Sequence, residues 1–540
     1  MNVLACTWED FQSRFATRQL LHQVIDAWAA RQPEQPAVLN ATRGTSMTYA
    51  ELRDRSLAAA RALARLGFHK GDFLATSLPL TDSHIVLEYA CFRAGIIHVP
   101  LDLRLSRDEL ILSLRLVGAR GYATALPHSV SGDVATLEQV WDAAALEEFL
   151  LRAVREGGSE ALPDIRPEDG AQVIFTTGST GAPKAALLTH RGIAVQNYCL
   201  GTAFEFEASR VMVHLPPSHV GCQSELLMTT LFWGGTAVTL EMFDPGKTLE
   251  AVERYKVRLL GQIPAMFHME WRHSEYEKRD LGSLEIAVYG GQSVPRPFLE
   301  KLRTMAPRIG TGLGLTETSG FCTYTPVTGE VDRVAASLGH AAPVYPMTIR
   351  EPMREDGSAG AELPPGEIGH VCFRGPQTFA GYVNDEEATR RTISTDGWLY
   401  TGDMGFVDPQ GLHFNGRAKW VIKPAGYQVF PGDVEEHICA LSGKVASCGV
   451  VGVPHPIWVE AIVAFVEKRP GAELTEAELR KHARGLTSYK RPLHYVIVEP
   501  GQMPLNRVAK VDTLRLRELA EIEVRQLQSR GRWMAETMEE

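Results

Sequence analysis

One stretch of the sequence combines glycines, hydroxyl side chains and a lysine in a pattern suited to holding an anion. It follows the apolar run 173–175 and consists of Thr176, Thr177, Gly178, Ser179, Thr180, Gly181, Ala182, Pro183 and Lys184. Glycines let the backbone approach an anion without a clash from Cβ, and successive N–H groups can point at its oxygens. The hydroxyls add donors and Lys184 adds a positive charge. The stretch therefore predicts a phosphate-binding loop rather than a plain surface turn.

This loop differs from two other nucleotide-binding patterns. A Walker A loop places Ser or Thr directly after its lysine to hold Mg²⁺, whereas Ala185 follows Lys184 here. The run Gly312-Leu313-Gly314 lacks the third glycine of a dinucleotide-binding turn. The sequence thus excludes a Walker A loop at 176–184 and a dinucleotide-binding turn at 312–314.

Composition restricts the class of protein. The chain has 540 residues and a net charge of −10, which disfavours a nucleic-acid partner because phosphate-backbone binders need a basic face. No uncharged apolar stretch is long enough for a membrane span. The eight cysteines are scattered without C-x-x-C spacing, so zinc sites and disulfide scaffolds are disfavoured and a cytoplasmic location is expected.

The elements that must position the loop alternate between helix and strand. Helices are predicted at 20–30 and at 49–66, the second with Thr48 as N-cap and Glu51 at the capping-box offset. Strands are predicted at 73–78, 96–101, 211–215, 236–240 and 284–289. This rhythm predicts sheets covered by helices on both faces, followed by a small β unit at 347–382.

A second boundary is predicted near 417–420, which divides the chain into 1–418 and 419–540. Beyond it, strands at 448–453, 461–466 and 495–498 alternate with helices at 434–441 and 476–486. Thr475 is the predicted N-cap of the latter helix, with Glu478 at the capping-box offset. The tail at 514–527 is predicted to be an exposed helix.

Beyond the phosphate loop, seven segments resemble, in order, those of the adenylate-forming superfamily. That superfamily comprises acyl- and aryl-CoA synthetases, adenylation domains of peptide synthetases, and beetle luciferases. The matching segments lie at 47–52, 94–102, 217–221, 314–318, 400–403, 416–426 and 504–510. Any one of them could arise by chance, but seven in the same order form a strong signal that covers nearly the whole chain.

The resemblance implies an α/β fold with a large N-terminal domain of helix-covered sheets, a small β-barrel unit, and a smaller mobile C-terminal domain. It also implies a ligase reaction in two halves. A carboxylic acid attacks the α-phosphorus of MgATP to give an acyl-adenylate and pyrophosphate, and a thiol, usually that of CoA, then releases AMP. The implied cofactors are ATP, Mg²⁺ and CoA, and the implied partner is a small-molecule carboxylic acid.

The resemblance also assigns roles around the reacting phosphate. Lys510 would bridge the substrate carboxylate and the α-phosphate, Thr316 would contact the α-phosphate, and Glu317 would be the Mg²⁺ ligand. Asp403 would accept both ribose hydroxyls, and Arg417 would contact ribose or phosphate.

Further residues are assigned to the adenine, the acid and the thiol. Gly291 and Gln292 resemble the adenine-side strand end, and Gly312 is expected near the wall of the acid-binding pocket. Two alternatives stay open for His219, which is either a pocket gate or a satisfied core histidine. The hinge position is Lys419, and the thiol-binding face carries Lys423 and Gly426.

The sequence departs from the family pattern at three places, and these departures leave alternatives open. Ala185 and Ala509 stand where glycine is usual, and Leu313 stands where an aromatic residue usually stacks on adenine. One alternative keeps the adenylation but transfers the acyl group to a carrier protein or a nitrogen nucleophile. Another is a non-catalytic nucleotide-binding scaffold, which the retained charged residues disfavour. A homodimer is a family-level expectation.

Overall fold

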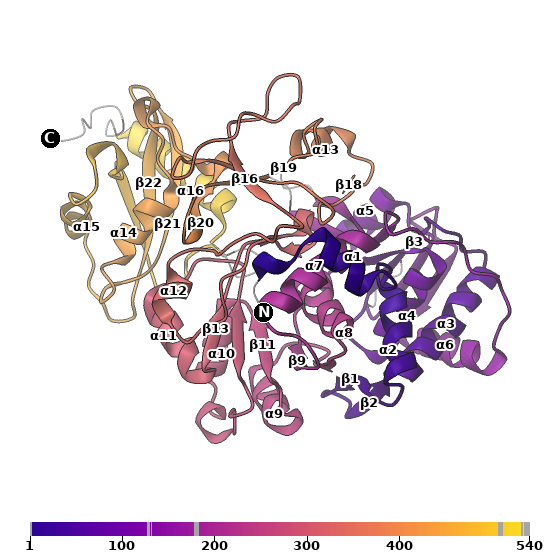
Figure 1. The fold of residues 1–540 in the computed structure, drawn as a ribbon. Helices are drawn as coiled ribbons and strands as arrows, with labels where there is room; N and C mark the ends of the chain where they lie inside the picture. Colours follow the sequence, from indigo (N-terminus) through magenta and orange to yellow (C-terminus); the bar gives the residue numbers. More distant parts are fainter. Residues whose placement is uncertain are drawn as a thin grey trace.

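Two seven-stranded sheets, together with the helices that cover them, form the larger part of the molecule (Figure 1). The computed structural model describes residues 3–126, 130, 132–177, 183–505, 511–530 and 533. It has the mixed α/β architecture that the sequence predicts, with a large N-terminal part and a smaller C-terminal part.

The first sheet has the strand order β13-β12-β11-β9-β10-β1-β2. Strands β13 to β1 run parallel in this order, and β2 pairs antiparallel with β1. The strands are β1 (Pro36–Asn40), β2 (Thr45–Thr48), β9 (Arg210–Val213), β10 (Thr236–Thr239), β11 (Leu259–Gln262), β12 (Ile286–Tyr289) and β13 (Arg308–Gly310). Because the strands are parallel, their carboxyl ends meet at one edge, where α/β sheets bind ligands.

The second sheet has the order β18-β8-β7-β4-β3-β5-β6. Its parallel part ends at β7, which pairs antiparallel with β8, as β8 does with β18. The strands are β3 (Phe73–Ser77), β4 (Ile97–Pro100), β5 (Gly121–Thr124), β6 (Gln139–Asp142), β7 (Gly170–Thr177), β8 (Pro183–Thr189) and β18 (Gly381–Tyr382).

Helices cover both sheets, and two of them lie deep in the core. Almost every residue of α4 and α7 is buried, and both contribute to a cluster that includes side chains from both sheets. The helices of this part are α1 (Trp8–Phe15), α2 (Leu21–Arg31), α3 (Tyr49–Arg65), α4 (Asp82–Ala94), α5 (Arg107–Val117), α6 (Ala143–Glu156), α7 (His190–Ala203), α8 (Thr229–Phe232), α9 (Pro245–Tyr255), α10 (Pro264–Arg272), α11 (Arg296–Met305), α12 (Val331–Ala335) and α13 (Glu386–Thr392). Apolar residues on all sides allow such full burial of a helix.

Two smaller sheets follow in this part of the chain. Strands β14 (Gly314–Leu315) and β15 (Gly320–Phe321) form a short antiparallel pair. The small β unit predicted at 347–382 is in fact a four-stranded antiparallel sheet that extends to Arg417, and β18 belongs to the second sheet instead. Its strands are β16 (Met347–Arg350), β17 (Gly369–Phe373), β19 (Leu399–Asp408) and β20 (Gly411–Arg417). Short helical turns are η1 (Val3–Ala5), η2 (Gly221–Met228), η3 (Tyr276–Lys278), η4 (Thr316–Thr318) and η5 (Ala418–Trp420).

The C-terminal elements gather at one end of the molecule (Figure 1). A three-stranded sheet in the order β21-β22-β23 is covered by helices. The elements are η6 (Pro424–Gly426), α14 (Pro431–Cys439), β21 (Val445–His455), β22 (Val459–Lys468), α15 (Glu476–Ala483), η7 (Ser488–Lys490), β23 (His494–Val498) and α16 (Thr513–Ser529).

Local signals in the sequence predicted several of these elements correctly. The side chain of Thr48 accepts from the N–H of Glu51 at 3.1 Å, and the Glu51 carboxylate accepts from the N–H of Thr48 at 2.7 Å. Thr475 and Glu478 form the same reciprocal pair at the start of α15. Both predicted capping boxes are thus confirmed, because a cap depends only on residues within one helical turn.

The prediction of an exposed C-terminal helix was wrong. Leu516, Ala520, Val524 and Leu527 of α16 are buried against the sheet that contains β21. These residues recur every three or four positions and so form one apolar stripe, which needs a covering surface. The charged residues between them had suggested a solvated helix, but they occupy only the outer face.

This packing predicts how two leucines of α16 differ in their effect on stability. Leu516→Ala should lower the opening free energy of the C-terminal sheet by about 2–4 kcal/mol, because Leu516 is fully buried. Leu514→Ala should change it by less than ~0.5 kcal/mol, because Leu514 is 42% exposed. Hydrogen–deuterium exchange of 445–468 in the full-length protein measures both. Equal loss of protection in the two variants would contradict the packing.

Candidate active site

The predicted phosphate loop begins in β7 and ends in β8, and these two strands pair antiparallel. Thr176 lies opposite Lys184 in the register, and Thr177 lies opposite Pro183. Gly178, Ser179, Thr180 and Gly181 lie outside the described residues. The hairpin brings the two ends of the loop together, so Lys184 is held beside Thr176 at the rim. The loop therefore connects two strands, whereas a Walker A loop leads from a strand into a helix.

Lys184 and Glu317 are brought together by a tyrosine from a distant part of the chain. The Nζ atom of Lys184 lies 4.9 Å from the ring centroid of Tyr382. The hydroxyl of Tyr382 donates to Oε1 of Glu317 at 2.7 Å. Tyr382 is positioned because β18 pairs with β8, next to Lys184. Tyr382 thus contacts Lys184 with the face of its ring and Glu317 with its hydroxyl.

A tight turn between β14 and β15 holds Thr316 and Glu317. The hydroxyl of Thr318 donates to the carbonyl oxygen of Gly320 at 2.7 Å and accepts from the N–H of Leu315 at 3.1 Å. Gln377 donates to the carbonyl oxygen of Thr318 at 2.7 Å. These bonds fix the backbone of η4, so Glu317 is presented from a rigid turn.

Gly312, just before this turn, cannot carry a side chain without a collision. A Cβ at this position would lie 1.9 Å from the carbonyl oxygen of Thr323. The close approach is made by the strand that returns from the turn, since Leu313 donates its N–H to the Thr323 hydroxyl at 2.9 Å. A glycine at 312 is therefore needed for the backbone to pack here.

Asp403 and Arg417 form a second charged group, on β19 and β20. The two residues are directly opposite in the antiparallel register, and Nε of Arg417 lies 3.0 Å from Oδ1 of Asp403. Asp403 is almost fully buried, whereas Arg417 is half exposed. A buried carboxylate in the middle of β19 and a half-exposed cation at the end of β20 are thus presented together.

Lys419 links this group to the phosphate loop. Burial lowers the pKa of Lys419, and the nearby positive charges of Arg417 and Lys184 lower it further. Lys419 is therefore close enough to both Arg417 and Lys184 to be repelled by each. Such a cluster is stabilised when an anion binds between its members.

His219 lies at the start of the π-helical turn η2. It is partly exposed, and its backbone carbonyl accepts from the N–H groups of Cys222 and Gln223. Its charge acts on Asp102: burial would raise the pKa of Asp102, but hydrogen bonds from Arg104 and the charges of Arg104 and His219 lower it overall. Cys222 is fully buried, and burial raises its pKa well above the ordinary value, as expected for a structural thiol.

The predicted adenine-side residues follow the carboxyl end of β12. Gly291 has φ +91°, a left-handed conformation that favours glycine, and Gln292 is exposed. Gly312 follows β13 in the same sheet. These residues thus lie at the edge where parallel sheets bind ligands.

The remaining predicted residues belong to the C-terminal part. Lys423 is exposed, and its N–H donates to the Glu460 carboxylate at 2.6 Å, while Gly426 ends η6. Lys510 lies outside the described residues. Of the residues on either side of it, Leu505 pairs with Val511, and the N–H of Asp512 donates to the Pro504 carbonyl oxygen at 2.9 Å.

Sequence reasoning missed Tyr382 and Glu225. No local signal connects Tyr382 to Glu317, since 65 residues separate them. Glu225 lies in η2 beside Gly314 and Gly320, which flank the Thr316–Thr318 turn. Glu225 is the one acidic residue in the run 222–228, but Gln223 and Ser224 precede it, so the sequence there gives no distinct signal.

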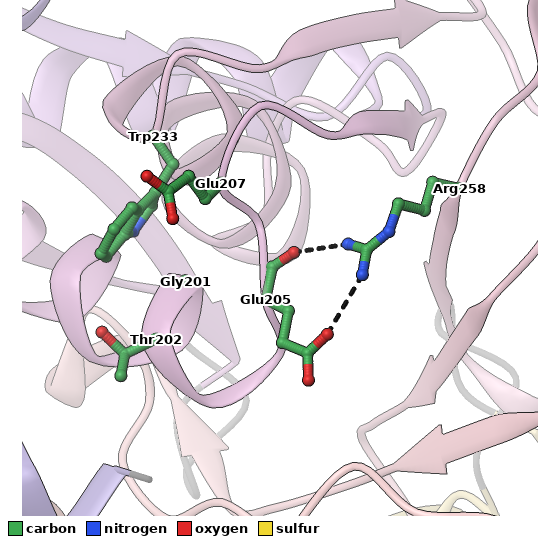
Figure 2. Close-up of a pocket in the computed structure, with 6 residues that line it drawn as sticks. All are labelled: Gly201, Thr202, Glu205, Glu207, Trp233 and Arg258. Carbon is green, nitrogen blue, oxygen red and sulfur yellow. Dashed lines mark hydrogen bonds and ion pairs between the residues drawn. The ribbon is translucent and has the colours of Figure 1, made fainter. Parts of the chain in front are cut away.

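A cavity of about 270 Å³ lies elsewhere, at the amino ends of the strands of the first sheet (Figure 2). Its lining residues are Gly201, Thr202, Glu205, Glu207, Trp233 and Arg258. Arg258 directly precedes β11 and donates to the carbonyl oxygen of Glu205 at 2.7 Å and to its carboxylate at 3.1 Å. This cavity is thus at the edge opposite to that of Gln292 and Gly312, and its arginine is already neutralised.

The sequence matches two family models. One is described as AMP-binding enzyme and matches residues 25–383, and the other as AMP-binding enzyme C-terminal domain and matches residues 433–510. Among described residues, no helix is both long and apolar enough to cross a membrane.

Individual proteins are similar over nearly their whole length. A feruloyl-CoA synthase from an Amycolatopsis species is 32% identical over 87% of this chain and 94% of that protein. ATP-bound MatB from Rhodopseudomonas palustris is 26% identical, with a TM-score of 0.82 over 93% of this chain and 99% of that one. The amide bond synthetase McbA from Marinactinospora thermotolerans is 26% identical, with a TM-score of 0.79 over the same shares.

The chain thus combines the loop residues, the threonine–glutamate turn and the paired aspartate and arginine. Its two parts match the two family models, and the chain belongs to the AMP-binding enzymes.

Proposed function

We propose that this protein is an AMP-forming acid–thiol ligase that activates a carboxylic acid with ATP and transfers the acyl group to CoA. The observation that carries this proposal is the linkage of Lys184, Tyr382 and Glu317 with the neighbouring pair Asp403 and Arg417. Adenylation requires a cation to bind phosphate, a carboxylate to bind a metal ion, and a buried carboxylate to accept the two ribose hydroxyls.

The cations would reduce the charge repulsion between the two reactants of the first half-reaction. A carboxylate must approach an α-phosphorus that is surrounded by negative oxygens, so positive charge near both lowers the barrier. Burial lowers the pKa of Lys419, and repulsion from Arg417 and Lys184 lowers it further. Binding of a triphosphate relieves this repulsion, so the cluster favours the nucleotide in its fully ionised form.

The nucleoside would be held on the other side of this cluster. The two oxygens of the Asp403 carboxylate suit the two ribose hydroxyls, and Arg417 is positioned to reach ribose or phosphate. Gly291 and Gln292 would border the adenine. Leu313 replaces the aromatic residue that is usual in the family, so adenine would pack on an aliphatic side chain here and lose a stacking contact of about 0.5–1.5 kcal/mol.

The residues present fit Mg²⁺ when it arrives with a nucleotide. Mg²⁺ takes one or two carboxylates and completes its shell with phosphate oxygens and water. Glu317 offers one carboxylate from a rigid turn, and among described residues no group of three or more His, Cys, Asp or Glu could hold a metal ion. When bound, the ion neutralises phosphate charge. Tyr382 then orients the carboxylate of Glu317, and Thr316 contacts the α-phosphate.

The C-terminal part would act in both half-reactions through different faces. We place the boundary between the two domains at 418/419, so Lys419 is the hinge. One orientation delivers Lys510 to the carboxylate and the α-phosphate. The other presents Lys423 and Gly426 to the thiol of CoA, where the absence of a side chain at 426 lets pantetheine pass close to the backbone.

A nitrogen nucleophile is a second candidate acceptor. The observation that favours it is the similarity to an amide bond synthetase, which matches this chain as fully as ATP-bound MatB does. Both candidates share the adenylation step and differ only in the second half-reaction.

The eight cysteines, none of which forms a disulfide, fit the reducing cytoplasm that we propose as the location of the protein.

The decisive experiment supplies ATP, Mg²⁺, CoA and a broad panel of carboxylic acids, and measures pyrophosphate release together with the products by mass spectrometry. We expect acid-dependent pyrophosphate release and an acyl-CoA. An accumulating adenylate without a thioester would favour the second acceptor class. Bound ATP without any pyrophosphate release would contradict the enzyme function and favour a nucleotide-binding scaffold.

Two lysine variants should separate the half-reactions. Lys510→Ala should slow adenylate formation by about 100-fold or more, because a preorganised charge at the reacting phosphate is lost. It should leave thioester formation from a supplied adenylate within about threefold. Lys423→Ala should do the reverse and slow only the thioester step, by about tenfold. Equal loss of both steps in either variant would contradict the two-face arrangement.

Two substitutions of Tyr382, which contacts both Lys184 and Glu317, should lower activity to different extents. Tyr382→Phe should lower kcat/KM for ATP by about 10- to 100-fold, because the carboxylate of Glu317 loses a hydrogen bond made at 2.7 Å. Tyr382→Leu should lower it further, since the ring contact with Lys184 is lost as well. The control is Tyr122→Phe, which removes a buried hydroxyl bonded to Thr124 in the second sheet. Equal effects of Tyr382→Phe and Tyr122→Phe on kcat/KM would exclude a specific role for Tyr382.

A further inference from the structure

Three glycines border the side chain of Glu225. A Cβ at Gly320 would lie 2.8 Å from its Cγ and 3.1 Å from its Oε1, and a Cβ at Gly314 would lie 3.2 Å from Oε1. A Cβ at Gly221, in the same helical turn, would lie 3.5 Å from Oε2. Three glycines therefore make the room that this side chain occupies, between η2 and the strands that flank Thr316 and Glu317.

No described cation neutralises this carboxyl group. Burial raises the pKa of Glu225 to about 8, and a backbone hydrogen bond from Phe321 acts in the opposite direction. No described lysine, arginine or histidine contributes to its pKa. A largely buried carboxyl that receives a backbone hydrogen bond retains acceptor capacity for a further group.

A buried donor converges on the same place. Gln196 of α7 is fully buried, and its Nε2 lies 3.0 Å from where a Cβ of Gly320 would be. Its Oε1 accepts from Asn197 at 2.9 Å, while Nε2 has no hydrogen-bond partner among the described residues. The orientation of the Asn197 amide is fixed, because its Nδ2 also donates to the Ser224 carbonyl oxygen at 2.6 Å. Gln196 therefore directs its NH₂ group toward Gly320.

We propose that Glu225 and Gln196 together bind a hydroxyl group on the substrate acid. A hydroxyl is the small group that both donates and accepts, so it can donate to the Glu225 carboxyl and accept from the Gln196 amide. An ammonium group would donate to Glu225 but leave the Gln196 donor unpaired, and a methyl group would leave both unpaired at a cost in affinity. The structure thus points to a hydroxylated carboxylic acid as the substrate class.

The position relative to the reacting groups supports this assignment. Gly314 and Gly320 are the first residues of β14 and β15, and η4 with Thr316 and Glu317 lies between these strands. An acid whose carboxylate lies near Thr316 can therefore extend toward Glu225. The inference rests on the proposed activation of an acid at this site, but it concerns recognition rather than turnover.

The test compares stable mimics of the acyl-adenylate, in which a sulfamate replaces the phosphate. Matched pairs carry a hydroxyl or a methyl group at the meta or para position of a benzoyl group, or at the end of a linear acyl chain. Isothermal titration calorimetry with the full-length protein should give a Kd at least tenfold lower for the hydroxyl member of one pair or more, as expected when a polar site rejects the analogue that lacks its partner.

Variants identify which residues read the hydroxyl. Glu225→Met and Gln196→Met should each reduce that ratio of Kd values to below about threefold, because methionine supplies neither the acceptor nor the donor. The matched control is Glu270→Met, since Glu270 is another buried carboxyl with a pKa raised to about 8 that is bonded to Gln262 rather than facing Gly320. Glu270→Met should keep the tenfold ratio. A loss of the ratio in all three variants would indicate a general structural effect and overturn the inference.

The remaining outcomes also decide the question. Equal Kd values within every pair, or no binding of any mimic, would overturn the inference. Retention of the tenfold ratio in Glu225→Met would do so as well. Selective binding without acid-dependent pyrophosphate release would uphold the recognition site and contradict the proposed function. Thioester formation with equal kcat/KM for hydroxyl and methyl acids would contradict the recognition site alone.

Discussion

Repulsion between a carboxylate and a triphosphate is the constraint around which the site is arranged. Both reactants are anions, so the protein must concentrate positive charge without neutralising it internally. Lys184 is held by the face of a tyrosine ring rather than by a carboxylate, and Glu317 is held by the hydroxyl of that same tyrosine. Cation and anion are thereby kept near each other without a direct ion pair, so each remains available to its own ligand.

The fold makes this arrangement by joining distant segments at strand ends. The β7–β8 hairpin presents Lys184, β18 brings Tyr382 to the next position in the same sheet, and the turn between β14 and β15 presents Glu317. The small antiparallel sheet adds Asp403 and Arg417 as a directly opposed pair. Each group is fixed by backbone pairing rather than by side-chain contacts alone, which gives the precision that catalysis needs.

Sequence reasoning succeeded where the determinant is local. Thr48 and Glu51 lie within one turn, and the run Val173-Ile174-Phe175 is apolar enough to indicate a strand by itself. The resemblance to the family identified the motif residues because each motif is a short continuous segment. The same procedure failed for α16, because the surface that buries Leu516 is formed by β21, which lies about 60 residues earlier.

The contacts between motifs could not be predicted for the same physical reason. Tyr382 meets Glu317 only because β18 pairs with β8, and strand pairing between distant segments has no local signature. Glu225 and Gln196 meet at Gly320 only after η2 and α7 have packed against β15. The types of the site residues could thus be predicted from sequence, whereas their partners could not.

A crystal structure with a non-hydrolysable ATP analogue and Mg²⁺ tests the central claim most directly. The account predicts that the ribose hydroxyls contact Asp403 and that the phosphates lie between Lys184 and Glu317. Nucleotide bound elsewhere, for example in the cavity beside Glu205 and Arg258, with Lys184, Glu317 and Asp403 all free of contact, would contradict it.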